Sequence, residues 1–262
     1  MSARRKVLAL AVSVVVLLSL MAGSASGMEK VTELSQLDGK VFAVPSGTVA
    51  DHLVLSMFPG ATFQYHDTVL DACLAVKAGE ADAAAYDEPI LKNIAAKNPG
   101  LVVLPDMITK DDYGFAVRLD QQDLKDTIDT VVTTLKNSGT YDEMLARWLP
   151  EKGSPEAMPE IVLTGEKGVL KFGTAAVTEP FSFLDENQQP IGFDIELAMA
   201  VAQELGMKLE ITLYDFGDMI PALAAGEVDM IGACITITEE RAREVLFSEP
   251  YYTGGIAALV AE

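Results

Sequence analysis

Short apolar runs alternate with longer segments that have one apolar face between residues 40 and 104. We expect the runs to form strands, at 41–44, 61–65, 82–86 and 101–104. We expect the segments between them to form helices, at 48–57, 68–78 and 88–97. Strands interleaved with helices of about 10–15 residues are typical of parallel β-α-β units. The first part of the chain is therefore predicted to be an α/β unit.

A second α/β unit is predicted after residue 168. Before it come an expected strand at 113–119, an amphipathic helix at 122–137 ended by Gly139, and a helix at 140–149. Residues 150–168 are rich in Pro, Gly and Glu and are expected to form a linker. The elements expected beyond the linker are strand 169–175, hairpin 181–193, helix 194–205, strand 209–214, helix 219–225, and strands 228–233 and 254–261.

Two stretches of the chain echo each other. Residues 74–89 and 221–236 both contain a helical segment, the tripeptide Ala-Gly-Glu, an aspartate and an apolar strand. Two lobes of like construction would produce this echo. Turns from a helix through glycine to a strand are common, however, so the echo alone is weak support.

The first 27 residues have the pattern of a secretory signal peptide. Arg4, Arg5 and Lys6 precede an apolar core at 7–20, which is shorter than the ~20 residues that span a bilayer. Small residues at 22–27 offer a cleavage site. We expect cleavage and a periplasmic mature chain, with an uncleaved anchor as the alternative. No cysteine follows the apolar core, so we expect no lipid anchor.

The charge of the chain excludes some partners. Removing three basic residues with the signal from the 19 present leaves 16 against 39 acidic residues, a formal charge of −23. Such a surface repels nucleic acid and anionic membranes, so neither is expected as a partner. Cys73 lies in an expected helix and Cys234 follows an expected strand in the other half. We expect two buried thiols rather than a disulfide.

Catalytic and cofactor motifs are scarce. The two histidines, His52 and His66, stand without a nucleophile motif, and the sequence has no metal-ligand cluster, P-loop or dinucleotide fingerprint. We therefore expect neither an enzyme nor a bound cofactor or metal.

The stretch 225–241, AGEVDMIGACITITEER, carries the most specific chemistry. An apolar strand opens into Thr236, Thr238 and Arg241. A guanidinium stays charged and can hold both oxygens of a carboxylate at once. This stretch resembles the carboxylate-binding motif of family 3 of the periplasmic solute-binding proteins, which capture amino acids for ABC importers.

The resemblance extends over nearly all of the mature chain. Its segments are KFGTAAVTEPFSFLDENQQPIGFDIELAMAVAQELGMKLEI (171–211), DFGDMIPALAAGEVDMIGACITITEERAREVLFSEPYYTGG (215–255), LDGKVFAVPSGTVAD (37–51), GEADAAAYDEP (79–89), YGFAVR (113–118) and LKNSGTYDEMLARWL (135–149). It implies a two-lobed α/β fold of the type II periplasmic-binding-protein (Venus flytrap) class, in which each lobe is a mixed sheet flanked by helices.

The order of the segments differs from that of the family. The family's usual chain begins with the GT and ITITEER segments, whereas here the SGT lobe comes first and the ITITEER segment comes last. This order predicts a circular permutation in which the linker 150–168 joins the usual ends. One lobe is expected at 31–110 and the other at 113–262, with a single covalent crossover near 105–116. We expect either a looser hinge or a dimer that exchanges lobes, so the oligomeric state stays open.

The resemblance also implies a site for a free α-amino acid between the lobes. Arg241 is the candidate for the carboxylate and Asp87 for the ammonium group, while Thr236 can bond to either. Thr48 can offer its hydroxyl and backbone N–H at a helix start. Each residue also has a plainer explanation. Arg241 would be a surface arginine and Asp87 a helix-capping residue, while Thr236 would be an ordinary strand residue and Thr48 an N-cap.

Further contacts are implied around these groups. The backbone carbonyls near Ala233 and Cys234 match acceptors for the ammonium group, and Tyr86 is a further candidate contact. Phe216 matches an aromatic wall, with a core phenylalanine as the even alternative.

Two departures from the family bear on the ligand. Ala175 replaces a frequent aspartate, which argues against lysine, arginine and histidine. Thr178, also a candidate ligand contact, replaces an aromatic that stacks on the ligand in the family. Glu179 either enters the pocket or is solvated. We therefore expect a polar or small neutral amino acid as the ligand.

The expected partners are the amino acid and an ABC permease in the membrane, which would recognise the closed form. An exported cyclohexadienyl or arogenate-type dehydratase on the same fold is one alternative, with Glu179 as the candidate general acid. A ligand-sensing module is the other, and it needs a separate membrane signalling partner.

Overall fold

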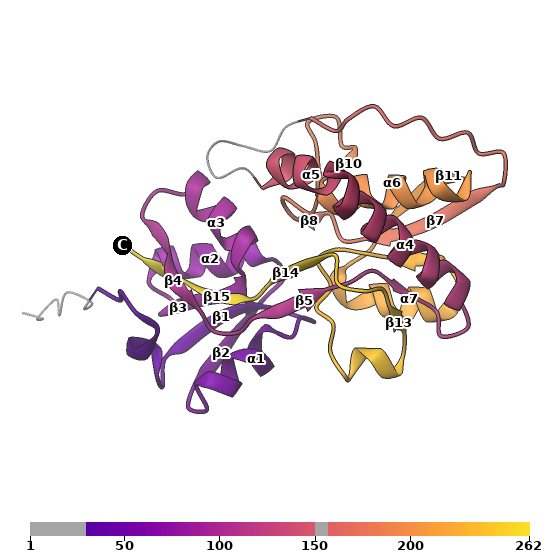
Figure 1. Cartoon of the computed structure of the whole chain (residues 1–262). Helices are drawn as coiled ribbons and strands as arrows, with labels where there is room; N and C mark the ends of the chain where they lie inside the picture. Colours follow the sequence, from indigo (N-terminus) through magenta and orange to yellow (C-terminus); the bar gives the residue numbers. More distant parts are fainter. Residues whose placement is uncertain (1–29, 150–156) are drawn as a thin grey trace, which may run out of the picture.

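A computed structural model describes residues 30–149 and 157–262, which form two α/β lobes joined by crossing segments (Figure 1). The expected signal peptide at 1–27 lies outside the described residues, as does the first part of the expected linker, 150–156. None of the described helices is both long enough and apolar enough to cross a membrane.

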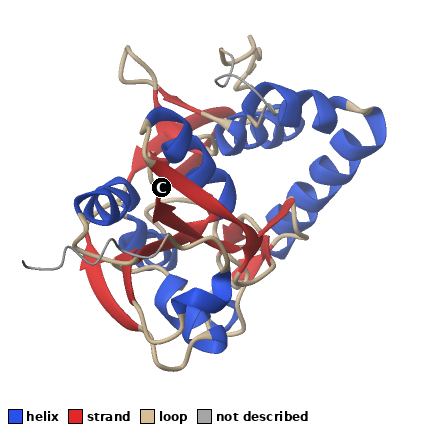
Figure 2. Cartoon of the chain, turned by 90° about the vertical axis from the view of Figure 1, so that its left-hand side faces the viewer, coloured by secondary structure: helices blue, strands red, loops and turns tan. Residues whose placement is uncertain are grey.

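The first lobe holds a five-stranded sheet with the order β2-β1-β3-β15-β4. β1, β2 and β3 run parallel, and β15 is antiparallel to both of its neighbours. Helices flank this sheet, and the C-terminal strand lies within it (Figure 2). The elements of the lobe are η1 (Leu34–Leu37), β1 (Val41–Pro45), α1 (Ala50–Met57), β2 (Thr62–His66), α2 (Val69–Ala78), β3 (Ala83–Asp87), α3 (Glu88–Lys97), β4 (Leu101–Met107) and β15 (Ile256–Ala261).

Local sequence signals explain the helix boundaries of this lobe. The Thr68 side chain accepts a hydrogen bond from Asp71 N at the start of α2, and Gly79 ends that helix in the left-handed conformation at φ 76°. All five residues of β3 are buried, as its unbroken apolar run predicts. β3 therefore lies in the middle of the sheet, and its last residue, Asp87, reaches the cleft.

The second lobe holds a five-stranded sheet with the order β11-β7-β12-β6-β13 and a small sheet with the order β10-β9-β8. Its helices are α4 (Gln122–Ser138), α5 (Thr140–Trp148), α6 (Phe193–Leu205), α7 (Met219–Ala225), η2 (Phe216–Asp218) and η3 (Arg241–Arg243). Its strands are β6 (Ala116–Val117), β7 (Val169–Thr174), β8 (Val177–Thr178), β9 (Ser182–Leu184), β10 (Pro190–Ile191), β11 (Lys208–Leu213), β12 (Met230–Ile231) and β13 (Leu246–Phe247).

The two large sheets follow one plan. In each, three parallel strands are followed by a strand that runs antiparallel, β15 in the first lobe and β6 in the second. The echo between residues 74–89 and 221–236 therefore corresponds to equivalent parts of two similar lobes.

Two strands connect the lobes, where the sequence predicted one crossover. β5 (Asp111–Tyr113) pairs antiparallel with β14 (Tyr252–Gly254), and β15 follows β14 into the sheet of the first lobe. In Figure 1 the last segment of the chain accordingly runs from the second lobe into the first. The expected assignment of 113–262 to one lobe is therefore wrong for its last strand, because the apolar run 256–261 fills the gap between β3 and β4.

Two smaller expectations have different outcomes. The stretch 113–119 is divided between β5 and β6, since the chain leaves the crossing pair at Tyr113 before it joins the second sheet at Ala116. The two cysteines are free and buried, as predicted.

Candidate functional site

A small cavity lies between the two lobes. The volume open to the centre of a water molecule is about 10 Å³, roughly what one water molecule requires. Its walls are Thr48, Val49, Ala50, Tyr86, Asp87, Phe216, Cys234, Thr236, Arg241 and Ile256. Seven of the nine residues that the sequence offered as ligand contacts are among these, and the other two are Ala233 and Thr178. They come from both lobes, so the cavity depends on how the lobes sit against each other.

Asp87 is the buried anionic group of the cavity. Although it stands directly before α3, its side chain makes no capping hydrogen bond to that helix. Instead Oδ1 accepts a hydrogen bond from the Tyr113 hydroxyl. Burial raises the pKa of Asp87 to about 7, against the opposing effect of this hydrogen bond. No described basic side chain makes an ion pair with Asp87 within 4 Å, so a cationic ligand group has a reason to bind there.

Arg241 is the cationic group, and it comes from the other lobe. One guanidinium nitrogen donates to the backbone oxygen of Thr236 at 3.1 Å, and the guanidinium lies 5.5 Å from the centre of the Phe216 ring. Burial lowers the pKa of Arg241 from its ordinary value, while Tyr86 and Asp87 act in the opposite direction. The aromatic and backbone contacts leave guanidinium N–H groups free to meet an anion.

The start of α1 contributes backbone groups to the cavity. The Thr48 hydroxyl donates to Pro45 O at 3.0 Å and accepts from Ala50 N at 3.3 Å, but the N-cap of α1 is Val49 rather than Thr48. Thr48, Val49 and Ala50 all line the cavity. The positive end of the helix is thus directed to the same space as Arg241, which suits an anionic group.

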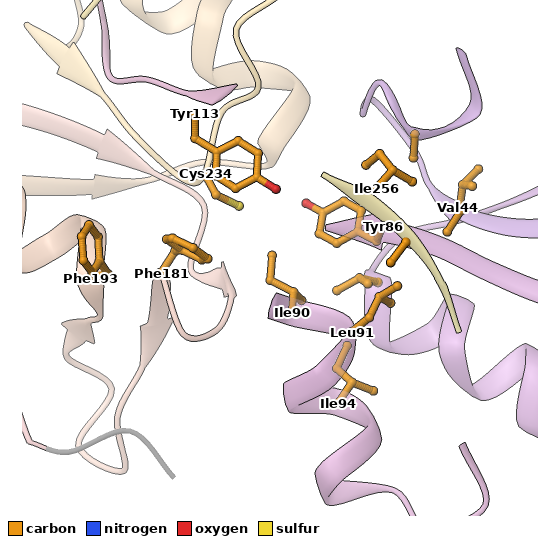
Figure 3. Packing of buried hydrophobic residues seen from close by; sticks show 14 of the residues in the cluster. Val44, Tyr86, Ile90, Leu91, Ile94, Tyr113, Phe181, Phe193, Cys234 and Ile256 are labelled. Carbon is orange, nitrogen blue, oxygen red and sulfur yellow. The ribbon is translucent and has the colours of Figure 1, made fainter. Parts of the chain in front are cut away.

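The crossing strand β5 brings Tyr113 to Asp87, although Tyr113 itself is not among the residues that line the cavity. In Figure 3, Tyr113 and Cys234 face Tyr86 and Ile256 across the gap between the lobes. Cys234 adopts a positive φ of 42°, and its sulfur lies 4.0 Å from Asp87 Oδ2. Burial raises the pKa of the Cys234 thiol well above its usual value, so the thiol stays protonated.

Ala233 and Thr178 do not reach the cavity walls. Ala233 is fully buried in the apolar cluster that contains Met219 and Leu223. The Thr178 hydroxyl, also buried, donates to Ser182 O at 3.3 Å within the small sheet. Its neighbour Val177 is 53% exposed and lines the cleft instead. Ala175 is likewise buried in the apolar cluster. Ala175 and Thr178, the two positions from which the sequence argued ligand specificity, therefore do not line the cavity.

Two larger compartments continue the cavity along the cleft. The first, of about 410 Å³, shares Thr48, Tyr86 and Phe216 with the cavity and is also lined by Asp67 and Asp215. The second, of about 340 Å³, is mainly apolar and lies between α3 and the small sheet. There Lys97 contacts both carboxylate oxygens of Glu179, at 2.6 and 2.7 Å, across the cleft.

The residues that the sequence did not single out are those that act through tertiary contacts. Val49, Ala50 and Ile256 contribute walls through their position on the backbone, and Tyr113 acts through Asp87. The strand motif YGFAVR contains Tyr113, but only the fold, in which β5 pairs with β14, brings its hydroxyl to Asp87. Among the described residues, no group of three or more His, Cys, Asp and Glu side chains is placed to hold a metal ion.

Comparison with known proteins gives matches to part of the chain. Residues 170–262 match the profile of the bacterial extracellular solute-binding proteins, family 3. The arginine-binding extracellular protein ArtP of Bacillus subtilis (strain 168) is 39% identical over 90 residues, which are 34% of this chain and 34% of ArtP. The chain thus spans about a third of the length of the curated relatives it matches.

Two solved structures of reconstructed proteins are also similar. An ancestral arginine-binding protein bound to arginine is 50% identical over 32% of this chain and 38% of its own, with a TM-score of 0.32. An ancestral amino acid-binding protein, described as a precursor of cyclohexadienyl dehydratase, is 40% identical over 43% of this chain and 41% of its own, with a TM-score of 0.32.

Proposed function

We propose that this chain belongs to the bacterial extracellular solute-binding proteins of family 3 and that it is a receptor for a free α-amino acid, which it binds between its lobes. One observation carries the proposal. Arg241 and Asp87 carry opposite charges, come from different lobes and line the same buried cavity. An α-amino acid presents a carboxylate and an ammonium group on one carbon, and it is the ligand that satisfies both residues at once.

Binding requires the lobes to move. The cavity holds about one water molecule in this arrangement, which is far less space than an amino acid occupies. The ligand therefore enters an opened cleft and is enclosed as the lobes close around it. It favours the closed form by the difference between its contacts in the two forms.

The compartment beyond the cavity bears on the class of ligand. Asp67 and Asp215 line it, and no lysine or arginine is among its lining residues. An acidic ligand side chain would face two like charges there, so we propose a neutral polar or basic amino acid. The names of the arginine-binding relatives fit the basic part of this range.

We propose reversible binding rather than turnover. Glu179, the carboxylate considered as a general acid, is held by Lys97 and does not line the cavity. Turnover of prephenate or arogenate by the purified chain would contradict this point.

We further propose that the receptor is exported to the periplasm and serves an ABC permease. The permuted chain order also belongs to this proposal. The permuted order is supported by the position of the family match, which begins at residue 170 and ends at 262 and therefore follows the lobe that contains the SGT segment. Because β5 and β14 connect the lobes within one chain, a monomer can close its own cleft without exchanging lobes.

A ligand screen tests the proposal. The mature protein is heated with each amino acid in turn, since a ligand that binds only the folded state raises the melting temperature. We expect a shift with neutral polar or basic amino acids and none with aspartate or glutamate, confirmed by titration calorimetry. The absence of a shift with every amino acid would contradict the proposed function.

A further inference from the structure

Asp194 is a buried carboxyl group that contacts the wall of the cavity from behind. It lies in the first turn of α6, its side chain is fully buried, and it is not among the residues that line the cavity. Its Oδ2 atom accepts a hydrogen bond from Cys234 N at 2.8 Å. An acidic residue in a first helical turn ordinarily interacts with its own helix, whereas this one is directed to a segment 40 residues away.

The segment that receives this contact is interrupted at Cys234. Before it, Gly232 N donates to Gly173 O at 3.1 Å, and after it, Gly114 N donates to Ile235 O at 3.1 Å. Cys234 itself has φ 42°, a left-handed conformation that residues other than glycine disfavour. The Asp194 carboxyl supplies the acceptor that a buried N–H group needs at this break.

The groups on this segment are those of the proposed site. Cys234 and Thr236 line the cavity, and the Thr236 carbonyl accepts from the Arg241 guanidinium at 3.1 Å. A change in the backbone at Cys234 is therefore passed to the carbonyl that orients Arg241. Asp194 is thus coupled to the anion-binding group without touching the ligand.

The second oxygen of Asp194 adds to this argument. Oδ1 is buried and has no hydrogen-bond partner among the described residues. Burial raises the pKa of Asp194, while the nearby Tyr251 hydroxyl acts in the opposite direction. The Tyr251 hydroxyl and Oδ1 do not, however, meet the geometry of a hydrogen bond. Burying a carboxyl group is costly to the fold unless it finds hydrogen-bond donors. Its contact with Cys234 is the benefit that the structure shows for keeping it.

We propose that Asp194 is a positioning residue for the ligand site, which holds the Cys234–Thr236 turn in the conformation that presents Arg241 to the ligand. This inference rests on the proposed function for its effect on binding, but its effect on the turn is independent of any ligand.

The test compares two carboxylates that both accept from a backbone N–H group of the second lobe. Asp229 Oδ2 accepts from Lys171 N at 3.0 Å, and Asp229 does not line the cavity. We expect Asp194→Ala to weaken amino-acid binding about tenfold or more, the scale of one lost hydrogen bond to a charged group. Asp194→Asn keeps an acceptor and should retain most of the affinity, and Asp229→Ala should bind as the wild type does. Equal affinities for Asp194→Ala and the wild type would overturn the proposal.

A second readout requires no ligand. In a Cys73→Ala background Cys234 is the remaining thiol, and its rate of alkylation by iodoacetamide reports on the turn. We expect Asp194→Ala to raise this rate several-fold in the folded protein, and Asp229→Ala to leave it unchanged. Equal rates in Asp194→Ala and the wild type would overturn the positioning role even if no amino acid binds. If Asp194→Ala does not fold, Asp194→Leu replaces it, because leucine fills similar space without an acceptor.

Discussion

Tyr113 and Asp87 are joined by a hydrogen bond that links the hinge to the anionic group of the cavity. Tyr113 is the last residue of the crossing strand β5, and its hydroxyl donates to Asp87 Oδ1 at the end of β3. The interlobe connection and the proposed ammonium site therefore share one contact. Lobe movement at β5 changes the environment of Asp87 directly.

Replacement of Tyr113 by phenylalanine tests this link. The hydroxyl opposes the effect of burial on the pKa of Asp87, which is about 7, so its removal should raise that pKa further. Fewer molecules then carry the ionised Asp87 that an ammonium group prefers. We expect calorimetry to show weaker amino-acid binding by Tyr113→Phe at pH 7, with part of the loss recovered at pH 8.5. A loss of equal size at both pH values would argue against this electrostatic role.

Asp87→Asn separates the role of the ammonium group from that of the carboxylate. The amide cannot carry the negative charge that attracts the ammonium group, while Arg241 remains in place. We expect binding of the α-amino acid to fall by more than binding of its deaminated analogue, which lacks the ammonium group. Competition titrations with the two ligands give both affinities. Equal losses for both ligands would remove Asp87 from this role.

Arg241→Ala should abolish detectable binding without unfolding the chain. Each charge-assisted hydrogen bond contributes about 1.5–3 kcal/mol, so loss of a bidentate carboxylate contact predicts a drop of at least about a hundredfold. The folded state loses little, because Arg241 is partly buried and burial already disfavours its charge. Calorimetry measures the affinity and thermal unfolding checks the fold. Arg241→Lys, which keeps a charge without the planar fork, should lie between the two. Near wild-type affinity for Arg241→Ala would refute the site.

The sequence predicted most of the elements because the chain alternates clear apolar runs with clear helix ends. The burial of the two free thiols and the helix ends at Gly79 and Gly139 depend on the neighbouring residues in the sequence, so they could be predicted. The placement of β15 depends on a long-range pairing with β3 and β4. An apolar run does not state which sheet it joins, and for this reason the second crossing strand was missed.

The same distinction applies to the site. Arg241, Asp87 and Thr236 were identified through a resemblance that covered their motifs, and the structure brings them to one cavity. Thr178 was misplaced, because adjacent strand residues face opposite ways and its neighbour Val177 faces the cleft. The contact between Asp194 and Cys234 spans 40 residues, and the acidic first turn of a helix gives no sign of it.

The pH dependence of stability gives a test that needs no ligand. Burial raises the pKa of Asp87 and that of Asp194 to about 7 in the folded chain, above the ordinary value of about 3.9. Between these values the folded chain keeps protons that the unfolded chain releases. The resulting stabilisation is complete below about pH 4 and is lost as the pH rises through about 7.

The comparison with Asp87→Asn isolates one of these two groups from the many other carboxylates. We expect the free energy of unfolding of the wild type, relative to that of Asp87→Asn, to fall between pH 5 and pH 8. Urea unfolding at both pH values measures the difference. A difference that stays constant would show that Asp87 does not titrate in this range.

Among the described residues, Lys97 and Glu179 form the one ion pair that joins the two lobes. Lys97 lies on one side of the cleft and Glu179 on the other. Lys97 is about half exposed, so the pair contributes about 0.2–1 kcal/mol. Because it forms in the closed arrangement, we expect Lys97→Gln to shift the chain towards the open form. Calorimetry should show a loss of affinity of up to about fivefold.

A matched control lies on the same helix. Lys92 pairs with Glu88 within α3 and does not cross the cleft, so Lys92→Gln should bind as the wild type does. Salt gives a second check, since added salt screens exposed pairs and should bring the wild type towards Lys97→Gln. Equal effects of the two lysine variants would show that the charge of α3, and not the interlobe contact, sets the affinity.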